Sequence, residues 1–205
     1  MTDSKNNPYS DGDLIERHRD GDELALGMLI QRYQGELFAF LTRFTGNSHL
    51  AEDVFQDTFL QVHLKADTFD TSRRFKPWLY TIAANKARDA LRKKNRRYAA
   101  PLDASMSASD DSSESFASML EGNIPGPDEI LVNHETRDAV RTIVSELPEA
   151  QREVLILAYF NGLPYKDVAD AVGSPLGTVK SRLHMAVKEF ARRWTHFARE
   201  TQHER

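Results

Sequence analysis

The sequence predicts an all-α protein made of two small helical domains that a flexible acidic linker joins. Two observations carry this prediction. Apolar residues recur at steps of three and four in separate stretches on both sides of residue 100, which is the spacing of one buried helix face. Between these stretches, residues 101–129 hold seven serines and seven acidic residues but no lysine or arginine, so this segment cannot bury enough apolar surface to fold alone. We therefore expect domains at residues 1–100 and 130–205, with the linker at residues 101–129.

Side chains that cap helices predict where the first three helices begin. In chain order the caps are Ser10 with Asp11, then Asp22, then Asn47 or Ser48. The first helix runs through Arg19, and the second has an apolar seam of Leu26, Leu29, Ile30, Tyr33, Leu37, Phe40 and Leu41.

The third predicted helix separates apolar from polar residues. One side carries Val54, Phe55, Thr58, Phe59 and Val62. Asp53, Gln56 and Asp57 share another face, because they are three and four residues apart. Taken alone, this polar face is best interpreted as an ordinary solvent-exposed surface.

A fourth helix, from about Pro77 to Arg96, lies within a strongly basic segment. Residues 73–97 hold ten lysines or arginines and one acid, Asp89. Such a block is commonly only a solvated helix face. Four aromatic residues lie in or beside it, namely Phe69, Phe75, Trp78 and Tyr80, so unpaired bases have rings on which to stack while the cations hold the backbone. The alternative is that Trp78 and Tyr80 belong to the core.

The segment 147–190 predicts three helices with a helix-turn-helix at its end. Gly173 supplies the turn, Pro164 and Pro175 stand at the starts of the two helices, and Ser174 is a candidate N-cap. The facing apolar seam consists of Val168, Ala169, Val172, Val179, Leu183, Ala186, Val187 and Phe190. The outer face of the second helix carries Lys180, Ser181, Arg182, His184, Met185 and Lys188, of which the cations suit contacts with phosphates or base edges.

Composition excludes several functional classes. The chain has 205 residues, of which 40% are hydrophobic and 28% charged, as in a soluble globular protein. Its polar N-terminus and the lack of eighteen consecutive apolar residues predict a cytoplasmic protein without membrane insertion. The lack of cysteine excludes disulfides, cysteine-ligated metals and thiol catalysis. The seven histidines show no metal-ligand spacing, and we expect no cofactor, no metal and no catalytic residue.

A stand-alone helix-turn-helix regulator is the main alternative. Such a regulator normally binds a palindrome as a dimer, but the sequence shows no heptad zipper, and the second basic segment has no role in that design. A helical adaptor without a nucleic-acid role leaves the charge segregation unexplained.

Four segments in this order resemble a bacterial sigma factor of the sigma-70 superfamily, extracytoplasmic-function (ECF) group. They read DLIERHRDGDELALGMLIQRY, AEDVFQDTFLQVH, RFKPWLYTIAANKARDALRKKNRR and LPEAQREVLILAYFNGLPYKDVADAVGSPLGTVKSRLHMAV. The resemblance implies a specificity subunit, without enzymatic activity, that brings core RNA polymerase to promoter DNA. It also implies an anti-sigma factor as a partner.

The resemblance assigns roles to three sets of residues. Asp53, Gln56 and Asp57 are implied to bind the clamp coiled coil of the largest polymerase subunit, while the flap of the second-largest subunit is a further implied contact. The −10 element is implied to meet Arg73, Arg74, Lys76, Trp78, Asn85, Lys86, Arg88, Arg92 and Lys93. The −35 element is implied to meet Thr178, Lys180, Ser181, Arg182, His184, Met185 and Lys188.

Two features depart from the family pattern. Met185 stands where many members carry a basic residue, which puts one DNA contact in doubt. The linker is longer and richer in serine than a minimal connector requires, and its charge suits either a flexible spacer or an electrostatic mimic of RNA.

Overall fold

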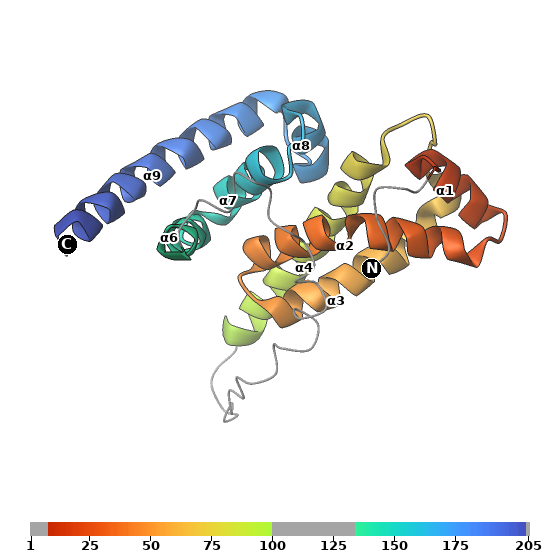
Figure 1. The fold of residues 1–205 in the computed structure, drawn as a ribbon, viewed down its shortest axis with the longest axis horizontal. Helices are drawn as coiled ribbons and strands as arrows, with labels where there is room; N and C mark the ends of the chain where they lie inside the picture. Colours follow the sequence, from red (N-terminus) through yellow and green to blue (C-terminus); the bar gives the residue numbers. More distant parts are fainter. Residues whose placement is uncertain (1–7, 100–133, 204–205) are drawn as a thin grey trace. The chain divides into compact units, whose positions relative to one another are not determined.

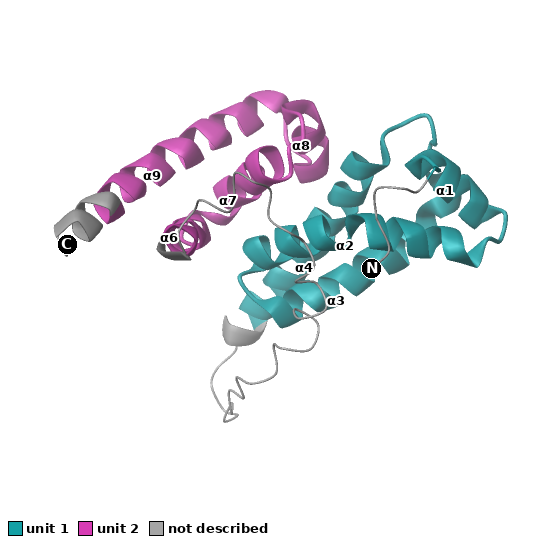
Figure 2. Ribbon diagram, viewed as in Figure 1, with its two compact units in different colours: residues 1–123 teal, residues 124–205 magenta. Residues whose placement is uncertain are grey.

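The computed structural model describes residues 8–99 and 134–203, and all of the regular structure in these two ranges is helical (Figure 1). The prediction of an all-α chain is therefore confirmed. The chain divides into two compact units, residues 1–123 and 124–205 (Figure 2). The predicted linker at residues 101–129 lies outside the described residues. No described helix combines the length and the hydropathy that a membrane span requires.

Unit 1 contains α1 (Asp11–Arg19), α2 (Glu23–Thr45), α3 (Ser48–Lys65), the short 3₁₀ helix η1 (Ala66–Thr68) and α4 (Phe75–Ala99). The predicted caps are confirmed for the first three α-helices, because Ser10, Asp22 and Asn47 each accept a bond from a backbone N–H of the first turn. Helix α4 begins two residues before the predicted start at Pro77. Proline is tolerated there because the first-turn N–H groups have no partner within the helix.

The core of unit 1 lies among α2, α3 and α4, which run side by side. All five residues of the predicted α3 stripe are buried, and so are most of the α2 seam. Leu26 and Ile30 are only half-buried, which corrects two positions of that seam. Tyr80 is fully buried against Phe40, with ring centroids 5.3 Å apart. Tyr80 is therefore a core residue, as the alternative interpretation held.

Unit 2 contains α6 (His134–Ser145), α7 (Glu149–Leu155), the π-helical turn η2 (Ile156–Phe160), α8 (Tyr165–Val172) and α9 (Leu176–His203). The three helices predicted between residues 147 and 190 correspond to α7, α8 and α9. Helix α9 is longer than the predicted DNA-reading segment and packs against α6, α7 and α8. Neither α6 nor the π-helical turn was predicted as a separate element.

Candidate nucleic-acid and protein interfaces

The polar face predicted on α3 is exposed along its whole length. Asp53, Gln56 and Asp57 all project into solvent, opposite the buried stripe of the same helix. Two leucines continue this face at helical spacing, since Leu60 is 57% and Leu64 is 65% exposed. An acidic and then apolar surface of this kind suits a partner that offers both cations and an apolar patch. Neither leucine was selected from the sequence, although their spacing from Asp57 was a usable signal.

A tight turn connects η1 to α4 and presents two of the predicted cations. The Asp70 carboxylate accepts hydrogen bonds from the Ser72 hydroxyl at 2.6 Å and the Ser72 N–H at 3.0 Å. These bonds, the hydroxyl first, lower the pKa of Asp70, and the nearby Arg73 acts in the same direction. Arg73 and Arg74 are both exposed. The turn thus holds its two arginines at the surface beside a fixed carboxylate.

Three aromatic rings flank this turn, one before it and two in the first turn of α4. Phe69 and Phe75 are buried, and Trp78 is only half-buried above them. The ring centroids of Phe69 and Trp78 are 4.5 Å apart, and those of Phe75 and Trp78 are 5.7 Å apart. Trp78 therefore packs against two core rings while it remains partly exposed, a combination suited to stacking an unpaired base.

The remaining cations of the −10 set are spread along α4. Asn85, Arg92 and Lys93 are exposed, whereas Lys76, Lys86 and Arg88 are half-buried. Several already have partners. Lys76 Nζ lies 2.7 Å from Glu36 Oε2 of α2, Arg88 donates to Asn85 Oδ1 at 2.5 Å, and Arg92 lies 3.3 Å from Asp89. The bond between Arg88 and Asn85 joins a cation suited to phosphate to an amide suited to a base edge.

The helix-turn-helix of unit 2 has the geometry that its glycine predicts. Gly173 ends α8 with φ 61°, a left-handed conformation that glycine adopts without steric cost. The Ser174 N–H bonds to the Ala169 carbonyl at 3.1 Å and closes the turn. Across it, α8 and α9 bury the predicted seam except at two positions. These are Val187, which is 41% exposed, and Phe190, which is half-buried. Both stand at the C-terminal end of the predicted seam, so the buried contact ends before them.

The beginning of α9 differs by one residue from the prediction. The carbonyl of Pro175 accepts the first helical bonds, from Thr178 N at 2.9 Å and Val179 N at 3.1 Å. The Ser174 hydroxyl instead accepts a bond from Arg182 Nη1 at 3.1 Å. Ser174 therefore anchors an arginine of the recognition face. The cap assignment at Ser174 is corrected, because the helix begins at Leu176.

The outer face of α9 presents the predicted DNA-reading residues together. Lys180, Ser181, His184, Met185 and Lys188 are exposed, while Thr178 and Arg182 are half-buried. The group is basic, lies on one helix, and sits beside the turn. Three exposed aromatics near the start of α8 were not selected from the sequence, namely Tyr159, Phe160 and Tyr165. A hydrogen bond with Tyr165 raises the pKa of the Tyr159 hydroxyl.

Within the described ranges, no group of three or more histidine, aspartate or glutamate side chains is arranged to hold a metal ion. Two histidines do meet, since His18 Nε2 of α1 and His63 Nδ1 of α3 are 2.9 Å apart. This pair joins two helices of unit 1.

Comparisons with known proteins agree with the two units. Residues 29–97 match the family Sigma-70 region 2, and residues 137–190 match Sigma-70, region 4. The ECF RNA polymerase sigma factor SigW of Bacillus subtilis is 30% identical over 170 residues, which are 83% of this chain and 89% of SigW. The RNA polymerase sigma-H factor of Pseudomonas aeruginosa is 33% identical over 181 residues, 86% of this chain and 89% of that protein.

A solved structure shares the fold. It is the sigma factor RpoE from Bartonella quintana in complex with the anti-sigma factor NepR. The similarity has a TM-score of 0.65 at 23% identity and covers 84% of this chain and 98% of that one.

Proposed function

This chain belongs to the sigma-70 family, in its ECF group, and we propose how its two units divide the work of promoter recognition. A sigma factor binds core RNA polymerase and directs transcription initiation at promoters, and that is the function of this chain. The alternative of a stand-alone dimeric regulator is not favoured, because the match includes region 2 as well as the helix-turn-helix. We assign this function to three exposed surfaces, two in region 2 and one in unit 2.

Region 2 carries two of the proposed surfaces. The acidic face of α3, formed by Asp53, Gln56 and Asp57, binds the clamp coiled coil of the largest polymerase subunit, and Leu60 and Leu64 extend the contact. The turn at residues 70–74 and the outer side of Trp78 hold an unpaired base of the −10 element. Asn85 lies near that base, and the α4 cations hold the backbone of the opened strand. The half-buried Trp78, whose ring packs at a tilt against Phe69, supports this assignment.

Unit 2 carries the proposed −35 reader. The exposed face of α9 from Thr178 to Lys188 enters the major groove, and its cations contact phosphates or base edges. The flap of the second-largest polymerase subunit is a further proposed contact. The domains at residues 1–100 and 130–205, with a linker at 101–129, remain our proposed organisation of the chain.

An anti-sigma factor is the proposed regulator, and the cytoplasm is the proposed compartment. The Bartonella quintana sigma factor with a similar fold is bound to such a factor in its solved structure. The exposed leucines of α3 give an anti-sigma factor an apolar surface that is otherwise costly to leave in water.

One observation carries the functional proposal, which is that region 2 and the helix-turn-helix occur together in one chain. The deciding experiment mixes the purified chain with bacterial core RNA polymerase. We expect the two to co-elute on size exclusion and to start RNA synthesis from promoters selected out of a random DNA library. Failure to associate, together with tight dimeric binding to a palindromic duplex, would return the chain to the stand-alone regulators.

A further inference from the structure

Helix α1 contacts residues 66–71, which lead into the turn that is proposed to hold the unpaired base. The side chain of Arg19, at the end of α1, donates three hydrogen bonds to backbone carbonyls of this segment. Its Nε and Nη2 lie 2.8 and 2.5 Å from the Ala66 oxygen, and Nη2 also donates to the Phe69 oxygen. Both acceptors lie at η1, where the Ala66 carbonyl also accepts the Phe69 N–H at 3.1 Å, so the guanidinium adds to the bond that closes this short helix.

The bond to Phe69 connects Arg19 with the stacking platform. Phe69 has its carbonyl on Arg19 and its buried ring on Trp78, with ring centroids 4.5 Å apart. A shift of the Phe69 backbone therefore moves the surface on which Trp78 rests. Trp78 is half-buried on this ring. The position of its exposed part therefore depends on the bond between Arg19 and the Phe69 carbonyl.

Two further contacts fix the turn itself. The Thr71 hydroxyl donates to Glu16 Oε1 at 2.7 Å. Gly12 faces the same residue, and a methyl group there would lie 3.2 Å from the Thr71 carbonyl oxygen, which is tighter than an ordinary contact. Residues 12, 16 and 19 thus line one side of α1 and all meet the segment 66–71.

Helix α1 is itself anchored firmly enough to act as a support. At its start, Asp11 accepts bonds from Arg32 and from the Tyr33 hydroxyl of α2. At its end, Arg17 Nη2 lies 2.5 Å from Asp22. The pair His18 and His63 joins α1 to α3. These contacts hold α1 against two core helices.

We propose that α1 holds the base-capturing segment in place and that Arg19 is a positioning residue for −10 recognition. This inference rests on the proposed function. It adds a part of the chain that the region 2 match, which begins at residue 29, does not include. Lysine cannot replace Arg19, because one ammonium group lacks the planar fork that reaches two carbonyls.

The test uses holoenzyme made from core polymerase and the full chain, with a promoter library randomised across the −10 element. Selection and sequencing give the enrichment of the preferred −10 sequence over the average one. We expect Arg19→Met and Arg19→Lys to reduce this enrichment roughly tenfold, the effect of losing a charge-assisted hydrogen bond. The matched control is Arg43→Met, which removes the same charge from an exposed position near the end of α2. Its enrichment should match the wild type, and all three variants should still co-elute with core polymerase.

Equal enrichment with Arg19→Met and Arg43→Met would overturn the proposal. If Arg19→Met does not fold, Thr71→Val and Glu16→Gln decide instead. The first removes the donor to Glu16 and should lower enrichment, and the second keeps an acceptor and should not. Two equal results would again overturn it. A wild-type holoenzyme that selects no −10 sequence would refute the proposed function and not this inference alone.

Discussion

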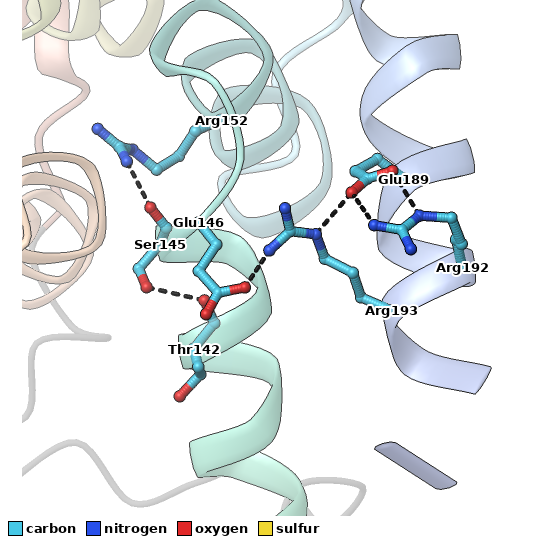
Figure 3. Close-up of polar contacts among 7 residues, drawn as sticks. All are labelled: Thr142, Ser145, Glu146, Arg152, Glu189, Arg192 and Arg193. Atoms are coloured by element: carbon cyan, nitrogen blue, oxygen red, sulfur yellow. Dashed lines mark hydrogen bonds and ion pairs between the residues drawn. The ribbon is translucent and has the colours of Figure 1, made fainter. Parts of the chain in front are cut away.

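Arg193 in α9 donates a hydrogen bond to the Glu146 carboxylate, 47 residues earlier and just after α6 (Figure 3). The same guanidinium lies 2.7 Å from Glu189, one turn earlier in α9. At the other side of this junction, Arg152 of α7 donates to the Ser145 carbonyl at 2.8 Å. This network begins next to Lys188, the last residue of the proposed DNA-reading face, and fixes the following part of α9 against the end of α6.

Glu189 makes the stability of this junction depend on pH. Hydrogen bonds from Arg192 and then Arg193 lower the pKa of Glu189 from 4.5 to about 2. Because the folded pKa is depressed, the stabilisation is complete above pH 4.5 and is lost as the pH falls toward 2. We expect Glu189→Gln to flatten the decline in unfolding free energy of unit 2 across this window. Urea unfolding followed by Trp194 fluorescence, in a Trp78→Phe background, measures it.

The control for Glu189 is Asp170→Asn, which removes an exposed carboxylate of α8 that makes no bond in this network. In this control the unfolding free energy of unit 2 should fall more steeply between pH 4.5 and 2 than it does in Glu189→Gln. Salt gives a second check, because exposed ion pairs weaken as ionic strength rises. If both variants decline equally, Glu189 does not carry the pH dependence.

Local signals in the sequence were sufficient for most of the helices and for most of the positions that they bury. Ser10, Asp22 and Asn47 cap the helices they were predicted to cap, because a capping bond spans only two or three residues. The stripe of α3 was predicted in full for the same reason. Val187 was placed wrongly, since helical spacing gives a direction but not how far a neighbouring helix reaches.

Contacts between distant residues could not be predicted from spacing. Arg19 and Phe69 are 50 residues apart, and neither lies in a motif that specifies the other. The engagement of Lys76 with Glu36, 40 residues earlier, was likewise hidden, because a basic block does not show which cations have partners. The family resemblance supplied the roles of these residues, and only the structure shows which of them are already bonded.

The acidic face of α3 predicts loss of polymerase binding on charge reversal. Asp53→Arg with Asp57→Arg replaces two exposed carboxylates by cations, which repel a basic partner. We expect binding to core polymerase to weaken by at least about tenfold, while the helical circular-dichroism signal is unchanged, since neither side chain is buried. Fluorescence anisotropy of labelled chain titrated with core polymerase measures the affinity.

One control separates position from net charge, and one further variant tests the leucines of α3. Asp20→Arg with Glu23→Arg makes the same charge change at the exposed end of α1 and start of α2, and should bind normally. Leu60→Asp tests the apolar extension of the face and should weaken binding at an exposed site without loss of stability. Equal weakening by the Asp20 and Glu23 pair would show a general charge effect.

Loss of cations from α4 should impair promoter opening but not binding to core polymerase. We expect Lys86→Ala with Arg88→Ala to slow promoter opening while binding to core polymerase is retained. The permanganate reactivity of thymines in the −10 region measures the opening. Arg88 also holds the Asn85 side chain, so its loss frees the amide that is proposed to lie near the captured base. The matched control is Lys94→Ala with Arg96→Ala, which removes two cations further along α4. Equal defects in opening and in polymerase binding would contradict the assignment.

Replacing Met185 by arginine should raise the affinity for DNA, because Met185 is an exposed apolar side chain on an otherwise basic face. Met185→Arg adds a cation beside Lys188 and Arg182, where one more phosphate contact becomes available. Each such contact releases counterions, so the plot of log binding constant against log salt should steepen by about 1. Holoenzyme titrated with promoter duplex at several salt concentrations gives this slope. The control is Val187→Arg, which adds the same charge at a 41% exposed position on the side of α9 predicted to face the seam. If Val187→Arg steepens the slope equally, the gain reflects net charge; if only Met185→Arg does so, position 185 faces the duplex.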